Sequence, residues 1–192
     1  MLIGISPCQS HNTGNVGDKL ITEVSKRLIE NIHGEKEFEI YFKAEDLHSR
    51  IDRVNEAEAV LLFGFEIQQN NTWPGEYRLT DDLESIKPPI IPISSSYSFF
   101  PGDKIELSKQ NLGPNTKVLL DRIVDDRPDH PIQVRDQWVG HVLQQNGYET
   151  IMTGDPGWYD IAKIGGNFHQ PDQIEQLVFT TPHSYLFLKQ AK

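Results

Sequence analysis

Short, mainly apolar runs alternate with segments of helical periodicity over most of this chain. The runs have the length and composition of buried strands, and alternating strands and helices are typical of α/β domains. The predicted strands are Leu2–Ser6, Phe38–Phe42, Ala59–Gly64, Ile90–Ile93, Ile132–Val134 and Tyr148–Met152.

Between these runs, apolar residues recur with the spacing of a helix. The clearest stripe consists of Leu20, Ile21, Val24, Leu28, Ile29 and Ile32, and it ends at His33-Gly34. Further helices are predicted over Glu45–Glu56, over Thr116–Val124, and from the helix cap Asp136 to Gly147. We expect Glu66–Tyr77 to form a loop.

This order of elements predicts a Rossmann-like, mostly parallel sheet with helices on both faces. Pro92 argues against a central position for its strand, because proline has no N–H to donate. Residues 1–160 are expected to form this domain, and residues 161–192 a linker and the possible start of a second domain, missing from this chain. Ligands of such sheets bind at the carboxyl ends of the strands.

A glycine-containing segment, Gly14-Asn15-Val16-Gly17-Asp18, follows the first strand and opens the first helix. Glycine allows a tight turn and a close approach to a ligand, and a helix start attracts anions. The segment lacks the glycine order of the dinucleotide fingerprint and the lysine of the P-loop. Asn15, Gly17 and Asp18 are therefore candidates for binding an anionic ligand. The alternative is a tight turn in which Asp18 caps the helix.

Other polar residues stand at later strand ends. Arg135 has the planar donor fork that binds carboxylates or phosphates, and the alternative is an ion pair beside a capping Asp136. Asp155 would orient a sugar hydroxyl or hold Arg135, unless it only forms an Asp-Pro turn. The hydroxyls of Ser94 and Ser95 are candidates for binding sugar or phosphate, with a polar loop as the alternative.

Composition excludes several classes of function. The net charge of −10 argues against general nucleic-acid binding. Because the overall charge repels anions, an anionic ligand must be attracted by a local arginine and by helix ends.

No apolar run is long enough to span a membrane and no signal peptide is evident, which predicts a cytoplasmic protein. One cysteine, Cys8, excludes an internal disulfide, and a nucleophilic role beside His11 is less favoured than an inert thiol. The histidines lack metal-ligand spacing, so no metal is expected.

Taken in order, these motifs resemble the polysaccharide pyruvyl transferase family. The resemblance covers Leu2 to Trp158 and depends on Gly14–Asp18, Phe63-Gly64, Ile93-Ser94, Val134–Asp136 and Thr153–Pro156. It implies the N-terminal half of a two-domain fold like that of the B-type glycosyltransferases. The active site of such a fold lies in the cleft between the halves.

The resemblance also implies a reaction of polysaccharide biosynthesis. The enolpyruvyl group of phosphoenolpyruvate, a co-substrate used without any cofactor, would form a ketal with two hydroxyls of a sugar or oligosaccharide. Arg135 would contact this donor, and Asn15, Gly17 and Asp18 would line the cleft. The family's general acid is a histidine in an Arg-x-His motif of the second half, of which Thr181-Pro182-His183 is only a weak likeness. We expect this acid in the missing second half. The expected protein partners are a completing second domain or further copies in a homo-oligomer.

Two other functions are compatible with the same residues. One is a non-catalytic module that binds a sugar or an anion. The other is a glycosyltransferase-like domain that uses a nucleotide sugar.

Overall fold

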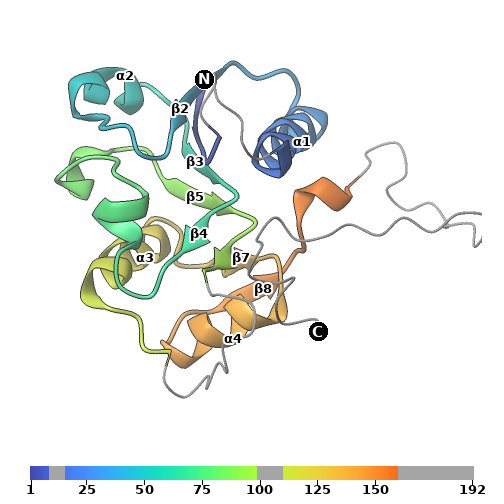
Figure 1. Cartoon of the computed structure of the whole chain (residues 1–192). Helices are drawn as coiled ribbons and strands as arrows, with labels where there is room; N and C mark the ends of the chain where they lie inside the picture. Colours follow the sequence, from blue (N-terminus) through green and yellow to red (C-terminus); the bar gives the residue numbers. More distant parts are fainter. Residues whose placement is uncertain (9–15, 99–109, 160–192) are drawn as a thin grey trace, which may run out of the picture. The chain divides into compact units, whose positions relative to one another are not determined.

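Four parallel strands, in the order β2-β1-β3-β5, form the main sheet of the computed structural model (Figure 1). The structure describes residues 1–8, 16–98 and 110–159. The strands are β1 (Leu2–Ser6), β2 (Phe38–Phe42), β3 (Val60–Phe63) and β5 (Ile90–Ile93). The predicted Asn15 and the predicted linker and second domain over residues 161–192 lie outside the described residues.

A second parallel pair, β7 (Ile132–Val134) and β8 (Thr150–Met152), lies beside the end of β5. An isolated parallel bridge between Ser95 and Val134 links the two sheets, and the Ser95 N–H donates to the Gln133 carbonyl at 3.1 Å. Every strand pairing within the described ranges is parallel. The predicted Rossmann-like, mostly parallel sheet is therefore confirmed.

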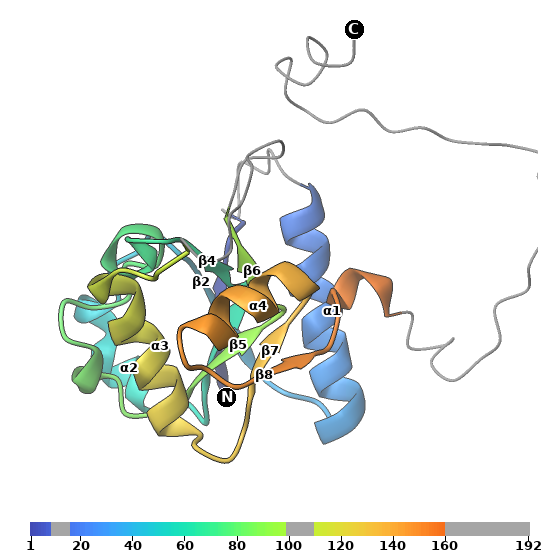
Figure 2. The ribbon, with the colours of Figure 1, turned by 90° about the horizontal axis from the view of Figure 1, so that it is seen from below.

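Helices cover both faces of the sheet, as predicted (Figures 1 and 2). The α1 helix (Val16–His33) packs Ile29 against a small apolar cluster that includes Phe63. The larger core on the other face includes Leu62 of β3 and apolar side chains of the remaining α-helices. These helices are α2 (Ile51–Asn55), α3 (Pro114–Asp126) and α4 (Gln137–Gln145). Successive residues of a strand point to opposite faces, which explains how one apolar strand supplies both clusters.

The predicted helix over Glu45–Glu56 is wrong in its first part. Helical structure begins only at the short helix η1 (His48–Arg50), which leads into α2. The backbone before it bridges to Leu79, and the Leu47 N–H donates to the Leu79 carbonyl at 2.6 Å. This long-range pairing replaces the first helical turn.

The segment Glu66–Tyr77 is more regular than the loop predicted for it. It contains β4 (Glu66–Ile67) and the short helical segment η2 (Thr72–Glu76). β4 pairs in parallel with β6 (Ser96–Tyr97), which follows β5. A two-residue strand has too few residues to show an alternating pattern, so the sequence gives no signal for it.

Pro92 is accommodated because β5 is an edge strand of the four-stranded ladder. The hydrogen bonds to β7 begin only past β5, at Ser95. No N–H is therefore required from Pro92 on that side.

β3 and β5 are interrupted at the same register position. The pairs of β3 with β5 and of β4 with β6 share one offset, so Gly64 and Ser94 occupy facing positions. Both residues have a left-handed backbone, with a φ of 58° in each. We call Gly64 and Ser94 the paired kink. Left-handed backbone is easy for glycine and strained for serine.

Substitutions at the paired kink are expected to change stability in opposite directions. Gly64→Ala should lower the free energy of unfolding by about 1 kcal/mol, because alanine is strained at this φ. Ser94→Gly should raise it by about 0.5 kcal/mol, since relief of strain exceeds the added freedom of the unfolded chain. Urea unfolding followed by circular dichroism measures both changes.

Gly140→Ala is the matched control, because Gly140 lies inside α4 without a positive φ. A Cβ there would meet Val134 and Thr150 at 3.6 and 3.7 Å, which are ordinary contacts. This variant should be more stable than the wild type by about 0.5–1 kcal/mol. If Gly64→Ala were as stable as the wild type, the strain assigned to the paired kink would be wrong.

Candidate functional site

The carboxyl ends of the parallel strands meet at one edge of the sheet. β2 lies on one side of β1, whereas β3 and β5 follow on the other side. Such a change of direction opens a crevice at the carboxyl edge of α/β sheets. Ser94 follows β5, Arg135 follows β7, and Asp155 lies three residues after β8.

Arg135 directly follows β7 at this edge. Its N–H donates to the Ser95 carbonyl at 3.0 Å, so its backbone is fixed to the segment after the paired kink. Its side chain is 40% exposed. The guanidinium group is thus anchored at its base and open to solvent at its tip.

Asp136 uses its two carboxylate oxygens for different purposes. Oδ1 accepts hydrogen bonds from the N–H groups of Trp138 and Val139, at 2.9 and 3.1 Å, and so caps α4. Oδ2 lies 3.7 Å from Nε of Arg135. The predicted cap and the predicted ion pair are both present in this one side chain.

Asp155 also caps a helix with one carboxylate oxygen and faces Arg135 with the other, from a different loop. Its Oδ1 accepts from the Gly157 N–H at 2.8 Å and caps the short helix η5 (Pro156–Trp158). Its Oδ2 lies 3.8 Å from Nη1 of Arg135. The prediction that Asp155 holds Arg135 agrees with this geometry. We call Arg135, Asp136 and Asp155 the arginine cluster.

The arginine cluster leaves the donors of the guanidinium group available. Both ion-pair distances exceed hydrogen-bonding range, and within the described residues no hydrogen bond of the Arg135 side chain is found. The three side chains together carry one negative charge. An anion would therefore bind through the directed donor fork and not through net charge.

Gly17 and Asp18 lie in the first turn of α1, whose first residue is Val16. Asp18 is therefore inside the helix and does not occupy the cap position suggested as the alternative. The Thr22 hydroxyl donates to the Asp18 carbonyl at 3.0 Å and lies 2.9 Å from the hydroxyl of Ser6, which fixes this turn to the end of β1.

The η5 helix also packs on α1, where a Cβ on Gly157 would be 3.6 Å from Leu20. The loop that carries Asp155 thus reaches α1 close to its first turn.

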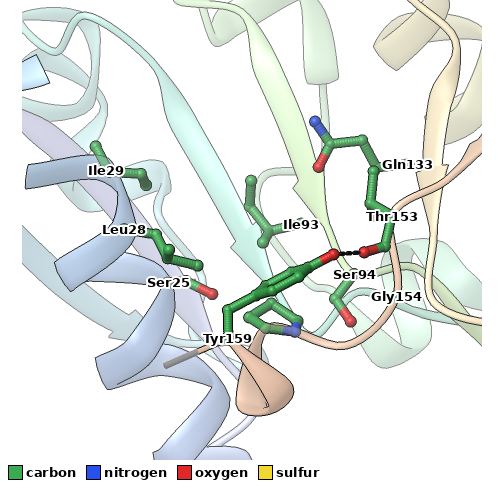
Figure 3. A pocket seen from close by; sticks show the side chains of 10 residues that line it. Ser25, Leu28, Ile29, Ile93, Ser94, Gln133, Thr153, Gly154 and Tyr159 are labelled. Atoms are coloured by element: carbon green, nitrogen blue, oxygen red, sulfur yellow. Dashed lines mark hydrogen bonds between the residues drawn. The ribbon is translucent and has the colours of Figure 1, made fainter. Parts of the chain in front are cut away.

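Ser94 and Ser95 are both buried, and neither hydroxyl has a hydrogen-bond partner among the described residues. Ser94 lines a cavity of about 150 Å³ on the α1 side of the sheet, whereas Ser95 does not (Figure 3). We call this space the α1 cavity. The two serines therefore do not form a single polar surface.

The sequence interpretation missed two residues that line the α1 cavity, namely Ser25 and Tyr159, whereas Thr153 belongs to the predicted Thr153–Pro156 motif. Ser25 has a signal in the sequence, because it stands on the apolar stripe of α1 between Ile21 and Ile29. A serine on a buried stripe is unusual and marks a polar requirement. Tyr159 gives no such signal, since its place over the cavity depends on the turn at η5.

A second polar group lies near the point where the sheet changes direction. Lys43 forms ion pairs with Glu66, at 3.4 Å, and with Glu76, which also accepts from Gln68 at 2.6 Å. Tyr77 is fully buried beside them, and this burial raises the pKa of its hydroxyl. Because these side chains pair with one another, we interpret the group as a support for the loop structure.

Among residues 1–8, 16–98 and 110–159, no group of three or more His, Cys, Asp and Glu side chains is arranged to hold a metal ion. None of the helices in these ranges combines the length and apolar character needed to cross a bilayer.

No protein-family model matches this sequence, and comparisons with curated proteins and with solved structures give no match either. The resemblance to the polysaccharide pyruvyl transferases therefore stays a prediction.

The double role of Asp136 predicts how its variants behave. Asp136→Ala should lower the free energy of unfolding by about 1 kcal/mol, because α4 loses both cap hydrogen bonds. Asp136→Asn keeps an oxygen that can cap and removes only the charge, so it should lose much less. Thermal unfolding of the two variants measures the difference. An equal loss in both would show that the charge, and not the cap, stabilises this helix.

Proposed function

We propose that this chain is the donor-binding half of a pyruvyl transferase-like enzyme that acts on a sugar. The observation that supports this most directly is the arginine cluster. Its exposed guanidinium group is held between two carboxylates at the carboxyl edge of a Rossmann-like sheet.

Phosphoenolpyruvate has two anionic groups close together, a carboxylate and a phosphate. The planar fork of Arg135 can donate two parallel hydrogen bonds to either group. Asp136 and Asp155 hold the fork from two sides, which reduces the conformational entropy lost when the donor binds. The first turn of α1, with Gly17 and Asp18, forms the neighbouring part of the proposed site.

The proposed reaction requires a proton and two sugar hydroxyls. Protonation of the enol methylene forms the methyl group and makes the adjacent carbon electrophilic. One hydroxyl adds to this carbon and loses its proton, and the C–O bond to phosphate then breaks, which leaves an oxocarbenium carbon. The second hydroxyl adds to that carbon and loses its proton, which closes the ketal. Of the two protons released, one replaces the proton used on the methylene and the other is taken up by the departing phosphate. Arg135 would stabilise the charge on the departing phosphate. The resemblance assigns the general acid to a second half of the enzyme.

Arg135→Ala is expected to weaken binding of phosphoenolpyruvate by at least about tenfold, because charge-assisted hydrogen bonds contribute roughly 1.5–3 kcal/mol. Titration calorimetry of the 192-residue chain measures this change. The circular dichroism spectrum should be unchanged, since the side chain is partly exposed and its backbone bonds remain.

Arg53→Ala is the matched control. Arg53 is 45% exposed and also lies between carboxylates, with Glu39 at 3.0 Å and Glu56 at 2.8 Å, but it belongs to α2. Its loss should leave phosphoenolpyruvate binding unchanged. A wild-type chain that binds no phosphoenolpyruvate at millimolar concentration would refute donor binding by this half. Binding without phosphate release, even with acceptor sugar and a completing domain present, would instead favour a non-catalytic module.

A further inference from the structure

We infer that the exposed indole of Trp158 is a stacking surface for one uncharged pyranose ring of the acceptor sugar, beside the arginine cluster. The inference rests on the proposed function, because it places the acceptor next to the proposed donor. The surface consists of the side chains of Val16, Leu20 and Trp158, and we call it the tryptophan patch.

The three side chains of the tryptophan patch are apolar and open to solvent. Trp158 is 86% exposed, Val16 is 76% exposed and Leu20 is 50% exposed. Val16 and Leu20 stand four residues apart in α1 and therefore share one side of that helix. Tryptophan is highly buried on average, so an almost fully exposed indole beside other exposed apolar side chains indicates a binding surface.

The η5 helix brings Trp158 to α1. In both ribbon views this short orange helix lies beside α1 (Figures 1 and 2). A Cβ on Gly157 would be 3.6 Å from the Leu20 side chain, and Trp158 is the next residue. The indole is thus attached to the chain directly beside the second turn of α1.

Hydrogen bonds connect Trp158 to the arginine cluster. Its N–H donates to the Asp155 carbonyl at 3.0 Å, and the N–H of Gly157 donates to Asp155 Oδ1 at 2.8 Å. The other carboxylate oxygen, Oδ2, faces Nη1 of Arg135 at 3.8 Å. The residue that orients the donor fork therefore also fixes the backbone of Trp158.

A pyranose ring is chemically suited to this place. Its axial C–H groups form an apolar face, which packs on the electron-rich face of an indole. Its hydroxyl groups stand at the rim of the ring, where they require hydrogen-bond acceptors. Asp155 Oδ2 accepts no hydrogen bond from the described residues, and a carboxylate oxygen has lone pairs for a hydroxyl. A ring on Trp158 would therefore find an acceptor for a hydroxyl at the oxygen that faces Arg135.

Size and charge favour one uncharged sugar ring over a protein partner or an acidic sugar. A stable protein interface uses roughly 20–30 residues on each side, whereas the tryptophan patch has three side chains. The chain carries a net charge of −10, and the side chains of the patch carry no charge that would attract an anion.

Trp138 provides an internal comparison. It is 45% exposed, and its N–H donates to Asp136 Oδ1 at 2.9 Å, so it belongs to α4 and to the Asp136 side of Arg135. The proposed donor site extends from Arg135 to the first turn of α1, on which η5 packs. Trp158 therefore adjoins the donor site, and Trp138 is not assigned to the acceptor.

The experiment is an NMR titration of the 192-residue chain with methyl β-D-glucopyranoside and, separately, with methyl β-D-galactopyranoside. The chain has three tryptophans, so it gives three indole N–H signals, which Trp73→Phe, Trp138→Phe and Trp158→Phe assign. We expect the Trp158 signal to shift saturably with at least one glycoside at millimolar concentration. The signals of Trp73 and Trp138 should stay in place.

Variants of Trp158 separate stacking from general apolar contact, with binding followed by the amide signals of Leu20 and Gly157. Trp158→Leu keeps an apolar side chain but removes the ring face, so it should weaken binding by about fivefold. Trp158→Phe keeps an aromatic face and should weaken binding by about twofold only. Trp138→Leu is the matched control and should leave the affinity unchanged. Since Trp158 is 86% exposed, its variants should fold as the wild type does.

Absence of a saturable Trp158 shift with either glycoside would overturn the inference. Equal affinity of Trp158→Leu and the wild type would also overturn it, because the ring face would then contribute nothing. Phosphoenolpyruvate is absent from this titration. A failed glycoside titration with intact phosphoenolpyruvate binding would therefore remove the acceptor surface alone, and the reverse result would remove the donor site alone.

Discussion

The paired kink at Gly64 and Ser94 is the constraint on which the candidate site depends. Two neighbouring strands leave their regular conformation at facing positions and then resume pairing with the same offset. The break lets the segment after β5 turn to β7, where the Ser95 carbonyl accepts the N–H of Arg135. Without this turn, β7 would not meet the sheet at this point and Arg135 would not stand at its edge.

Two aspartates lie on either side of the Arg135 guanidinium group and orient it. Asp136 and Asp155 come from different loops, yet each uses one oxygen to cap a helix and the other to face Arg135. The caps fix the carboxylates, because their backbone partners are part of helices. The guanidinium group is consequently oriented by rigid neighbours and keeps its donors for a ligand, which is the preorganisation that anion binding requires.

The arginine cluster and the α1 cavity lie on either side of one loop. Its residues Thr153 and Gly154 line the cavity, whereas Asp155 belongs to the arginine cluster. The cavity is uncharged and the cluster is charged, so the two are suited to different chemistry. One loop therefore contributes residues to both.

The sequence by itself determined the layered architecture and the edge at which ligands would bind. Apolar runs and helical stripes depend on local periodicity, so the strands, α1 and α4 were predictable, as were Arg135, Asp136 and Asp155 as candidates. The tertiary structure alone decided the β4–β6 pair, the late start of the helix after Leu47, and the α1 cavity. Each of these depends on distant segments that meet, such as Leu47 with Leu79, or α1 with the end of β5 around one cavity. Local pattern does not encode which distant residues meet, and only packing settles it.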